Sequence, residues 1–158
     1  MKWILTGLLF LSVFAATGQM VVDLGAGINT NATAAVNMEL TYRFKKINLG
    51  TGYIVGITDN ITKPDIFFLK AGKPIMITKT AGFDLGAGVA IQTYRENFVS
   101  KVDDRYSYYK RVNEITPLLF AQYHQRLIKD AEFFTRTVYT GRYFYAGAGL
   151  TYIFKQKK

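Results

Sequence analysis

Hydrophobic and polar residues alternate with a period of two along much of the chain, which is the pattern of a β-strand with one apolar face. Residues 34–45 show it most clearly: the even positions from Val36 to Phe44 are apolar or aromatic, and the odd positions from Asn37 to Arg43 are polar. The same alternation predicts four further strands, at residues 20–28, 47–58, 82–94 and 143–154.

Two other segments predict strands from weaker patterns. In residues 66–78, Phe67 and Leu69 lie on one face and Lys70 on the other, and the run Gly72-Lys73-Pro74 predicts a bulge or an irregular strand edge. Residues 131–140 alternate as well and predict a further strand.

Residues 112–126 fit two structures. As a strand they place Thr116, Phe120, Gln122 and His124 on the inward face. A helix is the alternative, because Thr116-Pro117 resembles a helix start and Leu119 and Tyr123 follow at a spacing of four. We favour the strand, because an even number of strands closes a sheet.

The connections between these segments alternate along the chain. Those at residues 45–46, 78–81 and 127–130 fall at one end of the strands, and those at 29–33, 58–65, 95–111 and 140–141 fall at the other. The predicted fold is therefore all-β, an eight-stranded antiparallel up-and-down barrel. Alternation from Thr93 to Val99 further predicts that the two strands flanking the longest connection continue beyond the barrel and turn near Val102-Asp103-Asp104.

The composition of the two faces indicates which one lies inside. In the five clearest strands the apolar face has no Asp, Glu, Lys or Arg, whereas the opposite face is rich in glycine. A narrow barrel needs small residues where its walls approach, and a charge facing lipid costs about 2–4 kcal/mol at the midplane. We therefore predict a transmembrane barrel with its apolar face toward lipid. A soluble periplasmic lipocalin-like ligand-binding barrel, with the apolar face inward, is the alternative.

The N-terminal segment has the features of a secretory signal peptide. Lys2 precedes an apolar run over residues 4–14, and Ala16-Thr17-Gly18 supplies a cleavage site of small residues. This predicts cleavage of residues 1–18 and a barrel domain at 19–158. The 158 residues include no cysteine, which excludes disulfides and thiolate chemistry, and 20 basic against 11 acidic residues give a net charge of +9.

The last predicted strand ends in Phe154, with Tyr152 two positions before it and alternating apolar residues upstream. This ending resembles the terminal strand of outer-membrane barrels, and the chain as a whole resembles the small eight-stranded family of outer membrane proteins A and X. The resemblance implies a location in the outer membrane of a Gram-negative bacterium and recognition by the barrel-insertion machinery. The four residues 155–158 after Phe154 depart from the family's ending.

Charged residues on the inward face form the first candidate site. A lumen this narrow is filled by side chains, and buried charges must be paired, so we predict a salt-bridged network that obstructs ion flow. Separate hydration of these charges by trapped water is the alternative. The residues of this interior network are Asp23, Glu39, Arg43, Lys70, Asp84 and Arg136.

Interleaved basic and aromatic residues in the longest connection form the second candidate site. They predict an extracellular surface that binds a protein partner or the phosphates of lipopolysaccharide, whereas export argues against nucleic acid. The residues of this candidate loop are Arg95, Phe98, Lys101, Arg105, Tyr106, Tyr108, Tyr109 and Lys110.

The sequence offers little for catalysis. His124 is the single histidine, and the serines Ser100 and Ser107 fall in the longest connection, far from its predicted depth. We predict no cofactor, no metal site and no enzymatic activity, and a role in surface structure, adhesion or envelope integrity. A lipid A-modifying enzyme is a weaker alternative, which would require His124 beside a serine and an acid at the lipid-facing rim.

Overall fold

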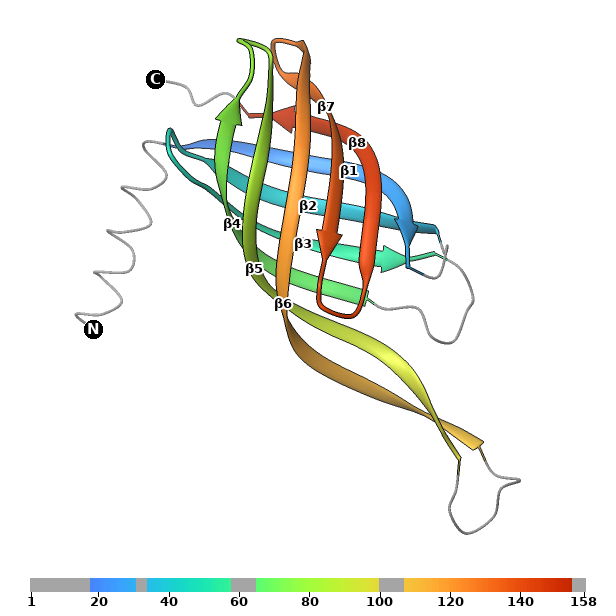
Figure 1. The fold of residues 1–158 in the computed structure, drawn as a ribbon. Helices are drawn as coiled ribbons and strands as arrows, with labels where there is room; N and C mark the ends of the chain where they lie inside the picture. The colour runs from blue at the N-terminus through green and yellow to red at the C-terminus, as the bar shows by residue number, and fades with distance from the viewer. Residues whose placement is uncertain (1–17, 31–33, 58–64, 100–106, 155–158) are drawn as a thin grey trace, which may run out of the picture.

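A computed structural model describes residues 18–30, 34–57, 65–99 and 107–154, with side chains for all of these except 96–99 and 107–109. The chain forms a closed barrel in which each strand pairs with its neighbours in sequence and β8 pairs with β1, all antiparallel (Figure 1). This confirms the predicted fold class. The strands are β1 (Gln19–Asn29), β2 (Ala34–Arg43), β3 (Asn48–Gly56), β4 (Asp65–Met76), β5 (Ala81–Val99), β6 (Ser107–Ile128), β7 (Ala131–Tyr139) and β8 (Phe144–Ile153).

Residues 112–126 belong to β6 and are strand, not helix. The part of the chain that the structure describes has no helix long and apolar enough to cross a membrane.

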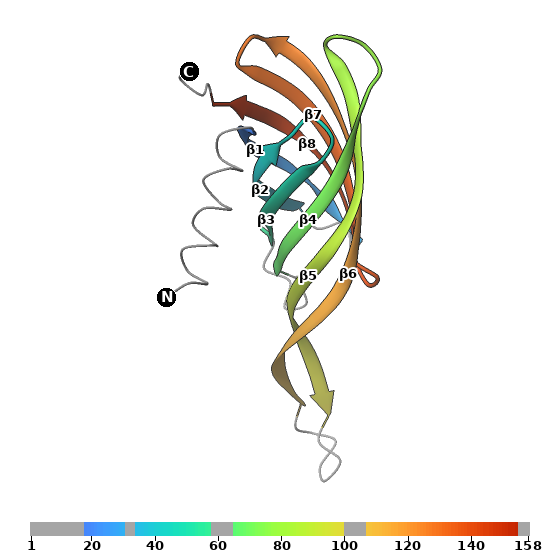
Figure 2. The same ribbon diagram turned by 90° about the vertical axis from the view of Figure 1, so that its left-hand side faces the viewer.

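The two ends of the barrel differ. β1 begins and β8 ends at the end where the short connections β2–β3, β4–β5 and β6–β7 lie, which we call the short-turn end (Figure 1). The hairpin of β5 and β6 projects from the opposite end, the hairpin end (Figure 2). The pairing of β4 with β5 stops at Asp65 and Thr93, and that of β7 with β6 stops at Tyr139 and Leu119.

Beyond those pairs β5 and β6 pair only with each other, as far as Val99 and Ser107. The six residues from Tyr94 to Val99 extend the hairpin by about 20 Å along the strand. The two strands therefore continue past the barrel as predicted, and the predicted turn at residues 102–104 lies outside the described residues.

The apolar face of the strands points outward. Leu24, Leu85 and Leu150 are each about half exposed, whereas Glu39 and Asp84 are 2% and 4% exposed. This orientation is incompatible with the lipocalin-like alternative, which needs the apolar face inside. Aromatic residues lie at both rims: Tyr139 pairs with Phe144 at the hairpin end, and the rings of Tyr152 and Phe154 meet at the short-turn end with centroids 4.9 Å apart.

Of the two structures predicted at Gly72-Lys73-Pro74, the bulge is wrong, because the β4–β5 register is continuous through these residues, whereas a strand edge is present there. The pairing of β3 with β4 ends at Gly72, so Pro74 has a neighbouring strand on one side only. Proline is tolerated there, since its missing N–H is not required for a ladder. Among the described ladders, a register shift occurs between Arg126 and Ile128, opposite β7.

Candidate functional site

Side chains fill the lumen in layers, and the layer toward the hairpin end is apolar. These inward side chains come from seven of the eight strands and pack against one another in the centre of the barrel. They are Ala35, Ile54, Ile66, Phe68, Ala90, Leu118, Phe120, Val138 and Tyr145.

Sequence reasoning placed Phe120 on the inward face but did not predict an apolar layer. It assigned the apolar face of the strands to lipid, and residues such as Ile54 and Phe68 interrupt that assignment because both faces of the strand are apolar at their positions. Alternation cannot separate the two faces where both are hydrophobic. Three apolar residues in succession, as at Ile66-Phe67-Phe68, are the signal that could have indicated it.

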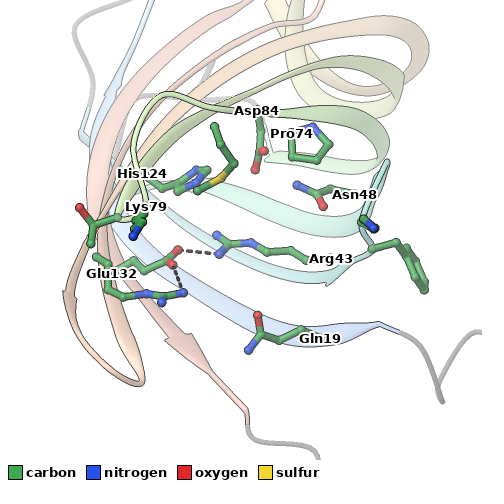
Figure 3. A pocket seen from close by; sticks show the side chains of 13 residues that line it. Gln19, Arg43, Asn48, Pro74, Lys79, Asp84, His124 and Glu132 are labelled. Atoms are coloured by element: carbon green, nitrogen blue, oxygen red, sulfur yellow. Dashed lines mark hydrogen bonds and ion pairs between the residues drawn. The ribbon is translucent and has the colours of Figure 1, made fainter.

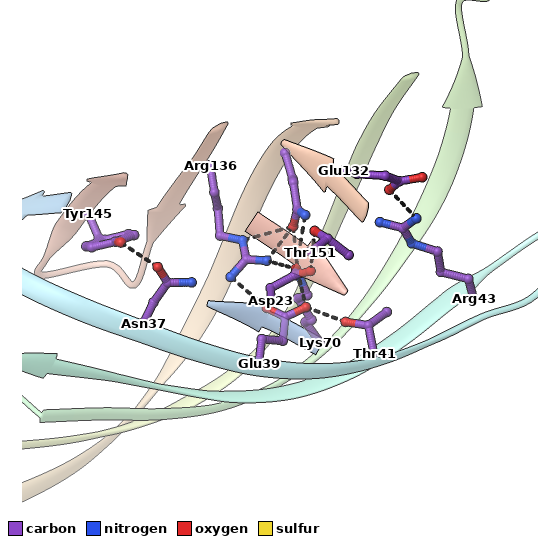
Figure 4. A network of polar contacts seen from close by, with 11 residues as sticks. Asp23, Asn37, Glu39, Thr41, Arg43, Lys70, Glu132, Arg136, Tyr145 and Thr151 are labelled. Atoms are coloured by element: carbon purple, nitrogen blue, oxygen red, sulfur yellow. Dashed lines mark hydrogen bonds and ion pairs between the residues drawn. The ribbon is translucent and has the colours of Figure 1, made fainter. Parts of the chain in front are cut away.

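Arg136 lies at the centre of the next layer, which is a network of buried ion pairs (Figure 4). Its guanidinium pairs with Asp23 and, at 3.0 Å, with Glu39. Its Nε donates to the Gln122 amide oxygen at 2.9 Å, and the Thr151 hydroxyl donates to the second Asp23 oxygen at 2.6 Å. The Arg136 guanidinium thus contacts both carboxylates of this layer.

Lys70 completes this network. Its ammonium lies 2.7 Å from a Glu39 oxygen and 4.0 Å from the centre of the Phe120 ring. Two carboxylates, Asp23 and Glu39, therefore face two cations, Lys70 and Arg136, so the layer is electrically balanced. Between these side chains and the next layer the lumen leaves no room for a water molecule.

The third layer opens at the short-turn end as a polar cavity of 240 Å³ (Figure 3). Arg43 pairs there with Glu132 at 2.5 Å, and Arg126 approaches the same carboxylate at 3.7 Å. Asp84 and His124 line the cavity, and each has one buried polar atom without a hydrogen-bond partner among the described residues.

The six predicted interior residues therefore fall into three groups. Asp23, Glu39, Lys70 and Arg136 form one connected network, whereas Arg43 belongs to a separate pair and Asp84 faces the cavity at the short-turn end. The sequence prediction omitted Glu132. Its position is two residues from Phe134 and four from Arg136, and the period-two rule could have placed all three on the inward face.

Among the side chains that the structure describes, no serine lies beside His124, as a lipid-modifying enzyme would require. The imidazole is 6% exposed and points into the lumen, not toward lipid, and the residues lining its cavity include acids but no serine. In the described ranges, no three His, Cys, Asp or Glu side chains are grouped so that they could hold a metal ion.

The structure describes only part of the second predicted site. Arg95 and Lys110 are exposed on the projecting hairpin. Phe98, Tyr108 and Tyr109 lie in its strands, with backbone alone described. Lys101, Arg105 and Tyr106 lie outside the described residues.

No protein-family model and no curated protein sequence matches the chain. Several solved structures do. The N-terminal β-barrel domain of Pseudomonas aeruginosa OprF is 12% identical, with a TM-score of 0.66 over 87% of this chain and 98% of that one. A de novo designed transmembrane β-barrel is 15% identical, with a TM-score of 0.64 over 87% and 97%.

The attachment invasion locus protein Ail of Yersinia pestis is also similar. In its complex with the heparin analogue sucrose octasulfate it is 12% identical, with a TM-score of 0.55 over 87% of this chain and 99% of that one. Each comparison covers nearly the whole neighbouring chain, and at these identities the likeness concerns the fold. This chain therefore has the fold of the small outer-membrane β-barrels.

Proposed function

We propose that this chain is a non-enzymatic protein of the bacterial outer membrane that serves surface structure, adhesion or envelope integrity. The observation that carries the proposal is the outward apolar face of a closed barrel. Backbone groups in hydrocarbon must be paired within the protein, which a closed barrel achieves, and side chains such as Leu24 and Leu150 gain from contact with acyl chains.

Residues 1–18 serve in this proposal as a signal peptide that is removed on export. β1 begins at Gln19, the residue that follows the predicted cleavage site, which fits a mature chain without the segment. The short-turn end then faces the periplasm and the hairpin end faces outward, because barrels of this kind have short periplasmic turns and longer extracellular loops. The terminal strand β8 would be recognised by the insertion machinery.

The lumen of the proposed protein is plugged. The apolar layer, the neutral ion-pair network around Arg136 and the absence of room for water beside that network all support a closed lumen. A small barrel filled by side chains provides a stable wall and an anchor, with no open pathway for solutes.

The hairpin is the proposed interaction surface. It projects past the rim, its outer strand edges are unpaired with other strands of the barrel, and it carries exposed basic residues such as Arg95 and Lys110. These features suit a protein partner that adds a strand, or the phosphates of lipopolysaccharide. The complex of Ail with a sulfated heparin analogue is an example of a polyanion bound to a barrel of this fold.

Membrane fractionation tests the location. We expect the protein in the outer-membrane fraction, soluble only with detergent, and migrating faster on gels before heating than after heating, as a folded barrel does. Mass spectrometry of the purified protein should give Gln19 as its first residue. Extraction in aqueous buffer without detergent would overturn the proposal.

Replacement of residues 97–109 by an Asn-Gly turn tests the hairpin. Because β5 and β6 pair only with each other beyond Thr93, the barrel should keep its unfolding free energy within about 0.5 kcal/mol and its heat-dependent migration. Binding to cells or to lipopolysaccharide should fall. Unchanged binding by a correctly folded variant would exclude residues 97–109 as the interaction surface and leave only the base of the hairpin, where Arg95 and Lys110 lie.

A further inference from the structure

Two arginines lie directly opposite each other where the hairpin leaves the barrel. Arg95 of β5 is the cross-strand partner of Arg111 of β6, and both side chains are exposed on the outward face of their strands. Like charges in directly opposed positions destabilise a strand pair. The barrel therefore carries a local electrostatic cost at this position.

Each of the other described arginines forms an ion pair with a carboxylate. Arg43 and Arg126 pair with Glu132, Arg136 pairs with Asp23 and Glu39, and Arg142 pairs with Glu114 at 3.3 Å. Within the described residues, no carboxylate forms an ion pair with Arg95 or Arg111.

Asp65 is the acid closest in register on the same face. It is the cross-strand partner of Thr93, one outward position below Arg95 on β5. Asp65 and Arg111 both lie near the Tyr53 hydroxyl, so Asp65 offsets part of the charge of Arg111 without forming an ion pair with it. Within the described part of the chain, the charge of the arginine pair is therefore compensated only in part.

The depth of the pair places it at the lipid headgroups. Below it the outward face is polar at Thr93 and Asn113, which share a 2.9 Å hydrogen bond, and then apolar at Ile91 and Ile115. Ile115 is 76% exposed, as suits contact with lipid. Arg95 lies four residues beyond Ile91, about 13 Å along the tilted strand. Long basic side chains can bend back over such a distance, so the two guanidinium groups can reach the layer of lipid headgroups.

We propose that Arg95 and Arg111 together bind the phosphate monoester of an outer-leaflet lipid headgroup. A guanidinium binds phosphate through two parallel hydrogen bonds, and two opposed guanidinium groups can hold one doubly charged phosphate between them. A phosphate between the two guanidinium groups would be attracted to both and would offset their mutual repulsion. This inference rests on the proposed function, because the hairpin end must face the outer leaflet.

The test uses the full mature chain folded into phosphatidylcholine vesicles that contain phosphatidic acid as the monoester lipid. Retention of phosphatidic acid is measured by native mass spectrometry after extraction. We expect the Arg95→Gln, Arg111→Gln double variant to lose at least about tenfold in affinity for phosphatidic acid. The Lys45→Gln, Lys46→Gln double variant removes the same charge at the short-turn end and should bind like the unchanged protein.

Three results separate the explanations. Equal affinities of the arginine variant and the unchanged protein would overturn the site. Displacement of the lipid by millimolar inorganic phosphate would overturn the choice of a lipid-borne phosphate in favour of the free ion. Heat-dependent migration, measured on the same vesicles, reports insertion: a chain that never inserts contradicts the proposed function, whereas an inserted barrel without lipid selectivity contradicts only the arginine site.

Discussion

Arg136 is the residue on which the charge balance of the lumen depends. Its side chain is fully buried between Asp23 and Glu39, so its replacement by Met leaves two carboxylates with Lys70 alone. Removing one partner of a buried ion pair typically costs about 3–5 kcal/mol. We expect a loss of that size for Arg136→Met in urea titrations of the barrel folded in vesicles.

Two comparisons make this expectation specific. Arg126→Met removes an ion pair whose arginine is 46% exposed, and it should cost less than about 1 kcal/mol. Adding Glu39→Gln to Arg136→Met restores the balance of charge and should recover at least about 1 kcal/mol. A double variant that is less stable than Arg136→Met would show that excess charge is not the cause.

Substitution of Gly25 tests how tightly the lumen is packed, because alanine adds a single methyl group there. Gly25 faces the lumen, where a Cβ would lie 2.6 Å from the side-chain amide of Asn37 and 2.8 Å from the Phe134 ring. Overpacking of this kind costs about 1–3 kcal/mol, so Gly25→Ala should lower the free energy of unfolding by that amount. Ala26→Val, on the lipid side of the same strand, should change it by less than about 0.5 kcal/mol. Equal effects at both positions would contradict the assignment of the two faces.

At the scale of the strand, the outward face should reject charge according to depth. Val89 lies on the lipid side of β5 in the middle of the barrel wall, opposite Leu69 and Pro117, and Val89→Arg should reduce the free energy of folding into vesicles by about 2–4 kcal/mol. Thr93→Arg, on the same face near the rim, should cost at most about 1 kcal/mol. A tolerated arginine at Val89 would mean that this face does not contact lipid.

The strands themselves could be predicted from alternation, because each has one face that is uniformly apolar. The sequence prediction ended all but the two hairpin strands within two residues of their observed ends, and it also anticipated the extension of β5 and β6. It left two structures open at Gly72-Lys73-Pro74, where proline marks a strand edge and not a bulge. Local sequence does not say which side of a strand lacks a partner.

The candidate site was predictable only as a set of inward residues. That Arg136 meets Asp23, 113 residues away, follows from the closure of β8 on β1 and from the register of every ladder between them. No spacing in the sequence encodes that contact. For the same reason Arg43 and Asp84, which alternation placed with the others, belong to a different layer of the lumen.

At the scale of the whole molecule, the three lumen layers together predict that the barrel does not conduct ions. The apolar layer excludes ions, and the paired charges below it cannot rearrange without exposing a buried carboxylate. In planar bilayers the folded protein should show no stable conductance of porin size. Long-lived openings of that size, from protein whose folding is verified by gel migration, would contradict a plugged lumen.

The hairpin has a mechanical consequence. Because β5 and β6 run past the rim of the barrel without a break in their pairing, the barrel sets where the hairpin strands begin and the direction in which they leave. A molecule that docks along them meets a surface that is already paired as strands, so binding carries less of the entropic penalty of ordering a loose loop. An epitope grafted onto these strands would be displayed at a set distance from the rim of the barrel.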